Sequence, residues 1–106
     1  MDEGKVHVLG IGQGESEKVV DTVTEIWNFL QQHGADRESL MINLGGGMLL
    51  DVGGFAASTF KRGMKFVNIP TTLLSMVDAS VGGKTGINLN DYKNHVGTFS
   101  QPEYVL

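Results

Sequence analysis

The chain has 106 residues, of which 41% are hydrophobic and 19% are charged, and this balance is typical of a folded globular domain rather than a disordered chain. A formal net charge of −4 argues against a nucleic-acid surface, which would carry a basic patch. We expect neither a membrane span nor a signal peptide, and the absence of cysteine excludes disulfides and thiolate metal sites and is compatible with a cytoplasmic protein.

The first expected elements are a strand and an amphipathic helix. Residues 6–9 (Val-His-Val-Leu) are typical of a short strand, and a loop with three glycines follows. Ser16 is the expected N-cap of the helix, and Glu17 suits its positive end. Gly34 stands where this helix should stop. The apolar stripe that would pack on a sheet consists of Val19, Val20, Val23, Ile26, Trp27 and Leu30.

A second strand and helix follow. Residues 39–44 form an apolar run typical of a buried strand, which leads into Gly45, Gly46 and Gly47. Residues 48–62 predict one helix that Gly63 closes. Its expected buried side chains are Leu49, Val52, Phe55, Ala56 and Phe60.

The rest of the chain continues the alternation. Residues 66–69 predict a strand that ends at Pro70, residues 72–79 a short helix, and residues 85–88 another strand. Residues 104–106 resemble the start of a further strand. Strands and helices in alternation predict an α/β fold, with right-handed crossovers and a parallel sheet.

The three glycines are the first candidate binding element. A cofactor diphosphate at a strand-to-helix turn needs close backbone approach, free N–H groups and a helix N-terminus, and this turn offers all three. Tight-turn packing explains the glycines equally well, and the G-x-G-x-x-G fingerprint is absent. We place Asp51 on the first helical turn, either stabilising the helix or accepting a hydrogen bond from the cofactor.

Thr71 and Thr72 follow the next strand, at the carboxyl edge where open α/β sheets bind ligands. Their hydroxyls either cap a helix or contact a ligand. The Gly-Gly-Lys-Thr sequence at 82–85 is not a P-loop, because Asp78 stands where that motif needs its first glycine. An ammonium beside a glycine pair, that of Lys84, still suits an anionic ligand.

Other basic residues share this alternative. Arg62, Lys84 and Lys93 either bind a phosphate or carboxylate or are solvated surface charges, and the amide of Asn94 follows Lys93. The histidines have no metal-ligand spacing, so surface or packing roles are expected for His7, His33 and His95.

These segments resemble the 3-dehydroquinate synthases closely. The matching positions are the three glycines with Asp51, residues 54–60 with Arg62 and Gly63, residues 70–74 and residues 77–85. A Gly-Glu-x-x-Lys element upstream is matched by Gly14, Glu15 and Lys18. The match continues through Asn88, Lys93, Asn94, Gly97, Phe99, Gln101 and Pro102, and so covers nearly the whole chain from about residue 14.

The resemblance implies an N-terminal Rossmann-like α/β domain that binds NAD, and a helical domain that carries a divalent metal, zinc or cobalt. Residues 1–106 would be a partial NAD-binding domain with a parallel sheet flanked by helices, about the middle third of the enzyme. The first strands would lie before Met1. The metal ligands, one glutamate and two histidines, would lie beyond Leu106, so that the helical domain is absent.

The resemblance also implies roles for single residues. Asp78 corresponds to an active-site acid beside nicotinamide and substrate, Lys84 and Asn94 to substrate-binding positions, and Lys93 to a position between cofactor and substrate. Arg62 corresponds to an arginine that reaches the other active site of a homodimer. Asp91 and Tyr92 depart from the Leu-Gly of many members. The positions that contact NAD correspond to Glu15, Lys18, Gly46, Gly47, Asp51, Thr71 and Thr72.

The implied reaction converts 3-deoxy-arabino-heptulosonate 7-phosphate to 3-dehydroquinate and phosphate, in the shikimate pathway. Other sugar-phosphate cyclases and glycerol-dehydrogenase-like enzymes are the alternative enzymes. An inactive fragment that binds nucleotide or self-associates is the alternative that is not an enzyme. We expect the 106-residue chain alone to be inactive and to form a homo-oligomer through unpaired strand edges.

Overall fold

The computed structural model of the chain describes residues 6–12, 14, 16 and 18–72 in full, and the backbone of the strands at 84–89, 92–99 and 104–105. The helix predicted at 72–79 lies almost entirely outside the described residues. The elements, in chain order, are α1 (Val20–Gln32), β1 (Leu40–Gly45), α2 (Gly47–Thr59), the 3-10 turn η2 (Phe60–Arg62), β2 (Lys65–Pro70), β3 (Lys84–Leu89), β4 (Tyr92–Phe99) and β5 (Tyr104–Val105).

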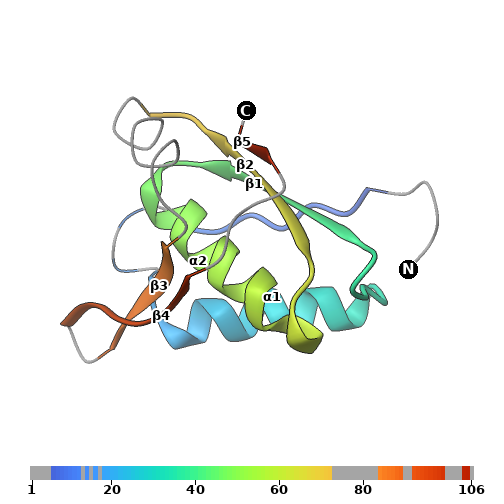
Figure 1. Cartoon of the computed structure of the whole chain (residues 1–106), viewed down its shortest axis with the longest axis horizontal. Helices are drawn as coiled ribbons and strands as arrows, with labels where there is room; N and C mark the ends of the chain where they lie inside the picture. Colours follow the sequence, from blue (N-terminus) through green and yellow to red (C-terminus); the bar gives the residue numbers. More distant parts are fainter. Residues whose placement is uncertain are drawn as a thin grey trace.

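A parallel sheet with the order β1-β2-β5 organises the molecule. β1 pairs with β2 from Leu40 opposite Lys65 to Gly45 opposite Pro70, so both strands reach the same edge together. β5 adds to the far side of β2, with Val67 opposite Tyr104. The predicted α/β fold, its parallel sheet and the strand near Leu106 are therefore confirmed (Figure 1).

β3 does not join this sheet, which corrects the prediction that residues 85–88 continue the parallel alternation. It pairs antiparallel with β4, a strand that the sequence analysis missed, in a separate two-stranded sheet. Only two residues separate Leu89 from Tyr92. A parallel crossover needs a dozen or more residues, whereas a two-residue connection suits a hairpin.

The helices form two layers on one face of the sheet. Figure 1 shows α2 between the strands β1 and β2 and the helix α1, and the contacts of α2 with all three agree. Because α2 is covered on both sides, it is buried almost all round. The core joins these layers and contains Val23, Ile26, Leu30, Ala35, Val52, Phe55, Ala56, Ala57, Phe60, Met64 and Phe66.

The ends of α1 differ from each other. Its N-cap is Val19, without a side-chain cap, so the prediction of Ser16 as N-cap is wrong. Val20, expected in the buried stripe, is 46% exposed. The C-terminus follows the prediction: Gly34 has φ +69°, and the N–H groups of Gly34 and Ala35 donate to the carbonyls of Gln31 and Leu30. These two bonds form a Schellman motif, which satisfies carbonyls that the helix leaves unpaired.

The predicted single helix over 48–62 is interrupted. α2 ends at Thr59, and within η2 the residues Lys61 and Arg62 adopt left-handed φ angles of 47° and 68°. Gly63, at φ 113°, then turns the chain into β2 and confirms the predicted closure. Left-handed backbone costs a residue with a Cβ about 1–2 kcal/mol, so this turn stores strain at two positions.

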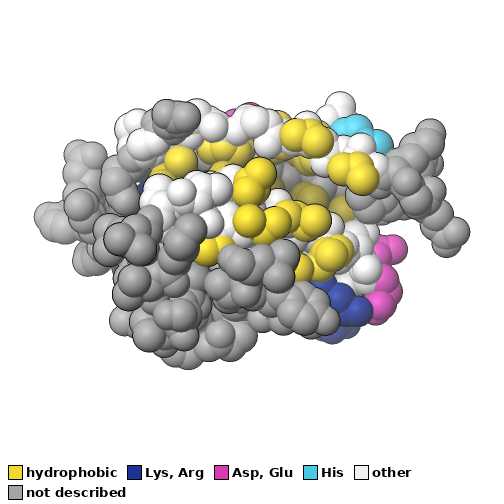
Figure 2. Space-filling view, turned by 90° about the horizontal axis from the view of Figure 1, so that it is seen from above, with side chains coloured by type: hydrophobic (Ala, Val, Ile, Leu, Met, Phe, Trp, Pro, Cys, Tyr) yellow, Lys and Arg dark blue, Asp and Glu magenta, His cyan; other side chains and the backbone are white. Residues whose placement is uncertain are grey.

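The other face of β1 is open, which corrects the prediction of a buried strand. Its side chains Leu40, Ile42 and Leu44 are between 51% and 59% exposed, and Figure 2 shows hydrophobic side chains spread over this side of the molecule. The described segment 6–12 is not a strand, contrary to the prediction for 6–9. Within the described part of the chain, no helix has the length and apolarity that a membrane crossing requires.

Candidate functional site

Three consecutive glycines, Gly45, Gly46 and Gly47, form the turn from β1 into α2. Gly46 is the N-cap of α2, in an extended conformation, and its carbonyl accepts the first helical hydrogen bond from Leu50 N–H at 3.1 Å. The N–H groups of Gly47, Met48 and Leu49 come before this bond, so the helix has no carbonyl four residues earlier to which they could donate. A Cβ at Gly45 would lie 2.6 Å from Leu49 Cδ2, so a larger residue there would have to displace the Leu49 side chain. Tight packing and an anion-binding helix start therefore coexist in the same turn.

The loop after β2 meets this turn. Thr71 N–H donates to Gly45 O at 2.9 Å, across the ends of the two parallel strands. Thr72 lies next to Gly46, where an added Cβ would come within 3.4 Å of Thr72 Cγ2. Both threonines are exposed. The structure thus brings together two elements that the sequence analysis identified separately, at the carboxyl edge of the sheet.

A charged pair supports the start of α2. Lys18 Nζ lies 2.7 Å from Asp51 Oδ2, and the Lys18 side chain is 3% exposed against 37% for Asp51. Asp51 is the fifth residue of α2, so its prediction on the first turn is corrected to the second. The ammonium is enclosed while the carboxylate reaches the surface. The Lys18 ammonium therefore pairs with the Asp51 carboxylate from the buried side.

A pocket of about 1010 Å³ borders the turn. It lies between residues 6–12 with Gly14, the C-terminal half of α1, β1 and the start of α2. Gly46, Gly47, Thr71 and Thr72 line it. Asp51 stands one helical turn beyond Gly47. Together these groups offer N–H donors at a positive helix end, two hydroxyls and a carboxylate. That set suits an anionic ligand with hydroxyl groups, such as a dinucleotide diphosphate and its ribose.

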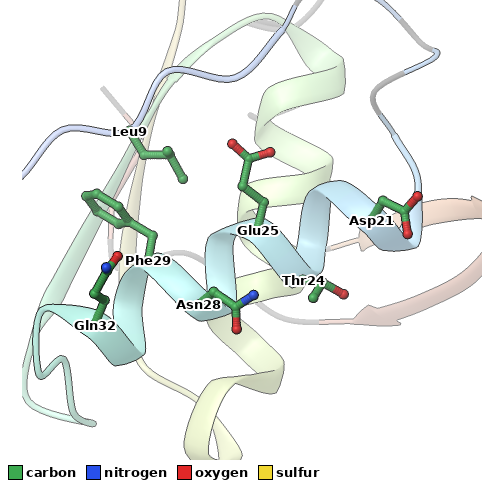
Figure 3. A pocket seen from close by; sticks show the side chains of 7 residues that line it. All are labelled: Leu9, Asp21, Thr24, Glu25, Asn28, Phe29 and Gln32. Carbon is green, nitrogen blue, oxygen red and sulfur yellow. The ribbon is translucent and has the colours of Figure 1, made fainter.

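A smaller pocket of about 420 Å³ lies on the outer side of α1 (Figure 3). Its lining from α1 consists of Phe29 and polar side chains, among them Asp21, Glu25 and Asn28. Leu9 of the N-terminal segment completes it. It holds none of the predicted site residues. The pocket at the glycine turn is therefore the candidate site.

The other predicted residues stand on other elements or outside the described part of the chain. Arg62 follows the far end of α2, which is roughly 20 Å long at 1.5 Å per residue. Lys84 begins β3 opposite Phe99, five residues beyond Asn94, so the backbone of the hairpin separates Lys84 from Asn94 by about 17 Å. Lys93 neighbours Asn94 on β4. Glu15 and Asp78 lie outside the described residues, and the roles of all these residues stay predictions.

Two of the histidines, His7 and His33, pack against each other. His7 stacks on His33 with ring centroids 4.0 Å apart, and Phe29 lies 4.6 Å from His33. This contact, with Leu9 and Ile11 on the core, holds the N-terminal segment to α1. Among the described residues, no three His, Cys, Asp or Glu side chains gather as metal ligands would.

Sequence reasoning missed a buried amide pair beside the site. Asn43 on β1 and Asn68 on β2 are 3% and 9% exposed, and Asn43 Nδ2 donates to Asn68 Oδ1 at 3.1 Å. Each asparagine stands as the one polar residue inside an apolar strand run. That interruption was the available signal.

Comparison with known proteins agrees with this geometry. A family model described as 3-dehydroquinate synthase N-terminal matches residues 8–106. A 3-dehydroquinate synthase of Parabacteroides distasonis is 53% identical over 98 residues, which are 92% of this chain and 28% of that protein. The chain thus spans little more than a quarter of that relative's length.

Solved structures of related cyclases superpose on the chain. A 2-epi-5-epi-valiolone synthase from Streptomyces hygroscopicus subsp. jinggangensis, with NAD+ and Zn2+ bound, gives a TM-score of 0.86 at 40% identity, over 91% of this chain and 27% of that one. A 2-deoxy-scyllo-inosose synthase complexed with carbaglucose-6-phosphate, NAD+ and Co2+ gives 0.88 at 34% identity, over 93% and 28%. With the family model matching almost every residue, the chain belongs to the 3-dehydroquinate synthase family.

Proposed function

We propose that the chain is the partial NAD-binding domain of a 3-dehydroquinate synthase, which converts 3-deoxy-arabino-heptulosonate 7-phosphate to 3-dehydroquinate and phosphate. The observation that supports this most is the meeting of the glycine turn with Thr71 and Thr72, in a chain of this family. The relative named 3-dehydroquinate synthase and the NAD+ of the two related cyclase structures support the same reading.

The described residues fit the cofactor. The N–H groups of the first turn of α2 would hold the diphosphate, and no side chain stands on Gly46 or Gly47 to block it. Asp51 can accept a hydrogen bond from a ribose hydroxyl, and Thr71 and Thr72 can donate to a phosphate oxygen. When bound, NAD supplies a transient oxidation of a substrate hydroxyl. The protein contributes positioning and electrostatics.

The remaining roles belong to the same proposal. Lys84, Lys93 and Asn94 bind the anionic substrate, Asp78 acts beside the nicotinamide, and Glu15 and Lys18 serve the cofactor. Arg62 reaches the second site of a homodimer in the cytoplasm. The divalent metal, zinc or cobalt as in the two cyclase structures, is held by residues beyond this chain. The 106-residue chain alone is inactive.

Phosphate release decides the function. The full-length protein with NAD and Zn2+ or Co2+ should release phosphate from 3-deoxy-arabino-heptulosonate 7-phosphate and form dehydroquinate. Glucose 6-phosphate and sedoheptulose 7-phosphate, run in parallel, test the alternative of another sugar-phosphate cyclase. Turnover of either one without turnover of the heptulosonate would reject the assignment.

Lys84→Met provides the sharper test of the substrate site. Loss of a charge-assisted hydrogen bond should remove about 1.5–3 kcal/mol of substrate or transition-state binding. NAD affinity should be kept, because the proposed role of Lys84 is to bind the substrate and not the cofactor. Lys65→Met on β2 is the control, since that ammonium is half exposed and pairs only loosely with Glu38 at 3.5 Å.

A further inference from the structure

The buried amide pair costs free energy of desolvation in an otherwise apolar layer. Asn43 and Asn68 are direct partners in the β1–β2 register, and their side chains meet beneath α2. A buried amide loses its hydration, and the loss is tolerated only when its polar atoms are hydrogen-bonded. Two apolar residues would fill the same space without that requirement. The pair therefore supplies something besides burial.

Gly53 of α2 is fitted to this pair. A Cβ at Gly53 would stand 2.5 Å from Asn43 Cγ and overlap Asn43 Oδ1. No other residue type leaves room for the amide at position 43. Three elements, β1, β2 and α2, are therefore interlocked at one point, through a hydrogen bond and a close approach of helix and side chain.

The interlock lies directly under the candidate site. Two residues further along each strand, Gly45 stands opposite Pro70, and the bond from Thr71 N–H to Gly45 O follows. Asn43 and Gly53 also border the pocket that Gly46 and Gly47 line. At 3% exposure, Asn43 acts on a ligand through the backbone it holds rather than by contact.

We propose that Asn43, Asn68 and Gly53 position the start of α2 against the threonine loop, and so set the affinity for the dinucleotide. This rests on the proposed function. Donors on α2 and on the loop after β2 must face one ligand together, so a shift of α2 relative to this loop would weaken the binding of that ligand. A directional amide bond fixes strand register and pleat more narrowly than an apolar contact does.

The test replaces both amides by leucines of similar shape. Removing both partners of a buried hydrogen bond leaves no unsatisfied group, so Asn43→Leu/Asn68→Leu in the full-length protein should keep the thermal midpoint. NAD measured by calorimetry should bind about tenfold more weakly. The turnover at saturating NAD should be kept, because the substrate side is untouched. Val23→Ala in α1, which loses core packing at a position that does not line the pocket, should lower the midpoint and keep the affinity for NAD.

Hydrogen exchange tests the inference without NAD. The Thr71 amide, bonded to Gly45 O, should exchange about tenfold faster in the leucine pair than in the native protein, with the amide of Ile26 in α1 unchanged. Unchanged exchange at Thr71 together with native NAD affinity would overturn the positioning role. If the native protein binds no NAD while the exchange result holds, the proposed function fails and the interlock stands.

A milder variant covers the case in which the leucine pair does not fold. Asn43→Ser shortens the donor side chain and admits water to Asn68. Its affinity for NAD should fall further than that of Val23→Ala at an equal loss of thermal midpoint. Equal affinities for the two variants would assign the amides to stability alone.

Discussion

The two ends of α2 are built in opposite ways. At the N-terminal end, backbone hydrogen bonds form the turn beside a pocket: Gly45 O accepts from Thr71 N–H, and Gly46 O accepts from Leu50 N–H. At the C-terminal end, side chains close the structure: Trp27 Nε1 donates to Ala56 O and lies 3.2 Å from Thr59 Oγ1. The C-terminal end of α2 is therefore anchored by side-chain hydrogen bonds, whereas its N-terminal end borders the pocket. Changes at the two ends should separate stability from ligand binding.

The largest effect is expected at the anchored end. Phe60 is 6% exposed and belongs to the core, so Phe60→Ala should lower the free energy of unfolding by about 3–5 kcal/mol. Urea unfolding of the full-length protein measures the loss. The folded fraction should retain its NAD affinity. A weakened affinity would show that the two ends are not independent.

The Lys18–Asp51 pair should give an asymmetric result. Asp51→Ala removes the carboxylate that lies 2.7 Å from an ammonium with 3% exposure, and we expect a loss of about 3 kcal/mol. Lys18→Met leaves a carboxylate that water reaches, so the loss should be about 1 kcal/mol. Chemical unfolding of both variants checks the order. Equal losses would mean that Lys18 is better solvated than its burial indicates.

Thr59 offers a smaller test at the anchored end. Its hydroxyl donates to Phe55 O at 2.7 Å and lies beside the Trp27 indole. Thr59→Val keeps the shape and removes the hydroxyl, and should lower the free energy of unfolding by about 1 kcal/mol. Calorimetry should show an unchanged NAD affinity for this variant.

Alanine in the glycine turn should have the opposite effect to Thr59→Val, with stability almost kept and NAD affinity lowered. An added Cβ on Gly47 meets no atom within 4 Å, and Ala is the better helix former, so Gly47→Ala should change stability by less than about 1 kcal/mol. It should weaken NAD binding, because the methyl group enters the pocket. Thr24→Ala, at an exposed position of α1 that does not line this pocket, is the control. Native affinity in Gly47→Ala would remove the turn from the cofactor site.

Asp36 should give the smallest effect, through pH. The N–H of Glu38 lowers the pKa of Asp36 below its usual 3.8, and the Ser39 hydroxyl and N–H lower it further. Because the folded pKa is the lower one, the carboxylate stabilises the fold above about pH 3.8, and this is lost as the pH falls through the folded pKa. The urea midpoints of native protein and Asp36→Asn should differ at pH 6 and converge at acid pH.

Local chemistry made part of this structure predictable. The glycine turn, the threonine loop and the stop at Gly34 follow from backbone requirements of single residues, and each is found where the sequence places it. The parallel pairing of β1 with β2 followed from the alternation of apolar segments.

What depended on partners distant in the sequence was not predictable. Residues 6–9 have strand composition, but a strand exists only where an edge accepts it, and the described segment instead stacks His7 on His33. The burial of Lys18 depends on Asp51, which lies 33 residues further on. The Asn43–Asn68 bond likewise depends on a register that no single strand reveals.

The strained turn at Lys61 and Arg62 has a consequence for laboratory evolution. Both residues have left-handed backbone. Lys61 Nζ donates to Ala35 O at 3.1 Å, whereas the described contacts include no hydrogen bond of the Arg62 side chain within the chain. Glycine at position 62 would relieve about 1 kcal/mol of strain. A library of variants selected for heat resistance alone should therefore be enriched in Arg62→Gly. Selection for growth of the cell would show whether the function of the protein requires the Arg62 guanidinium.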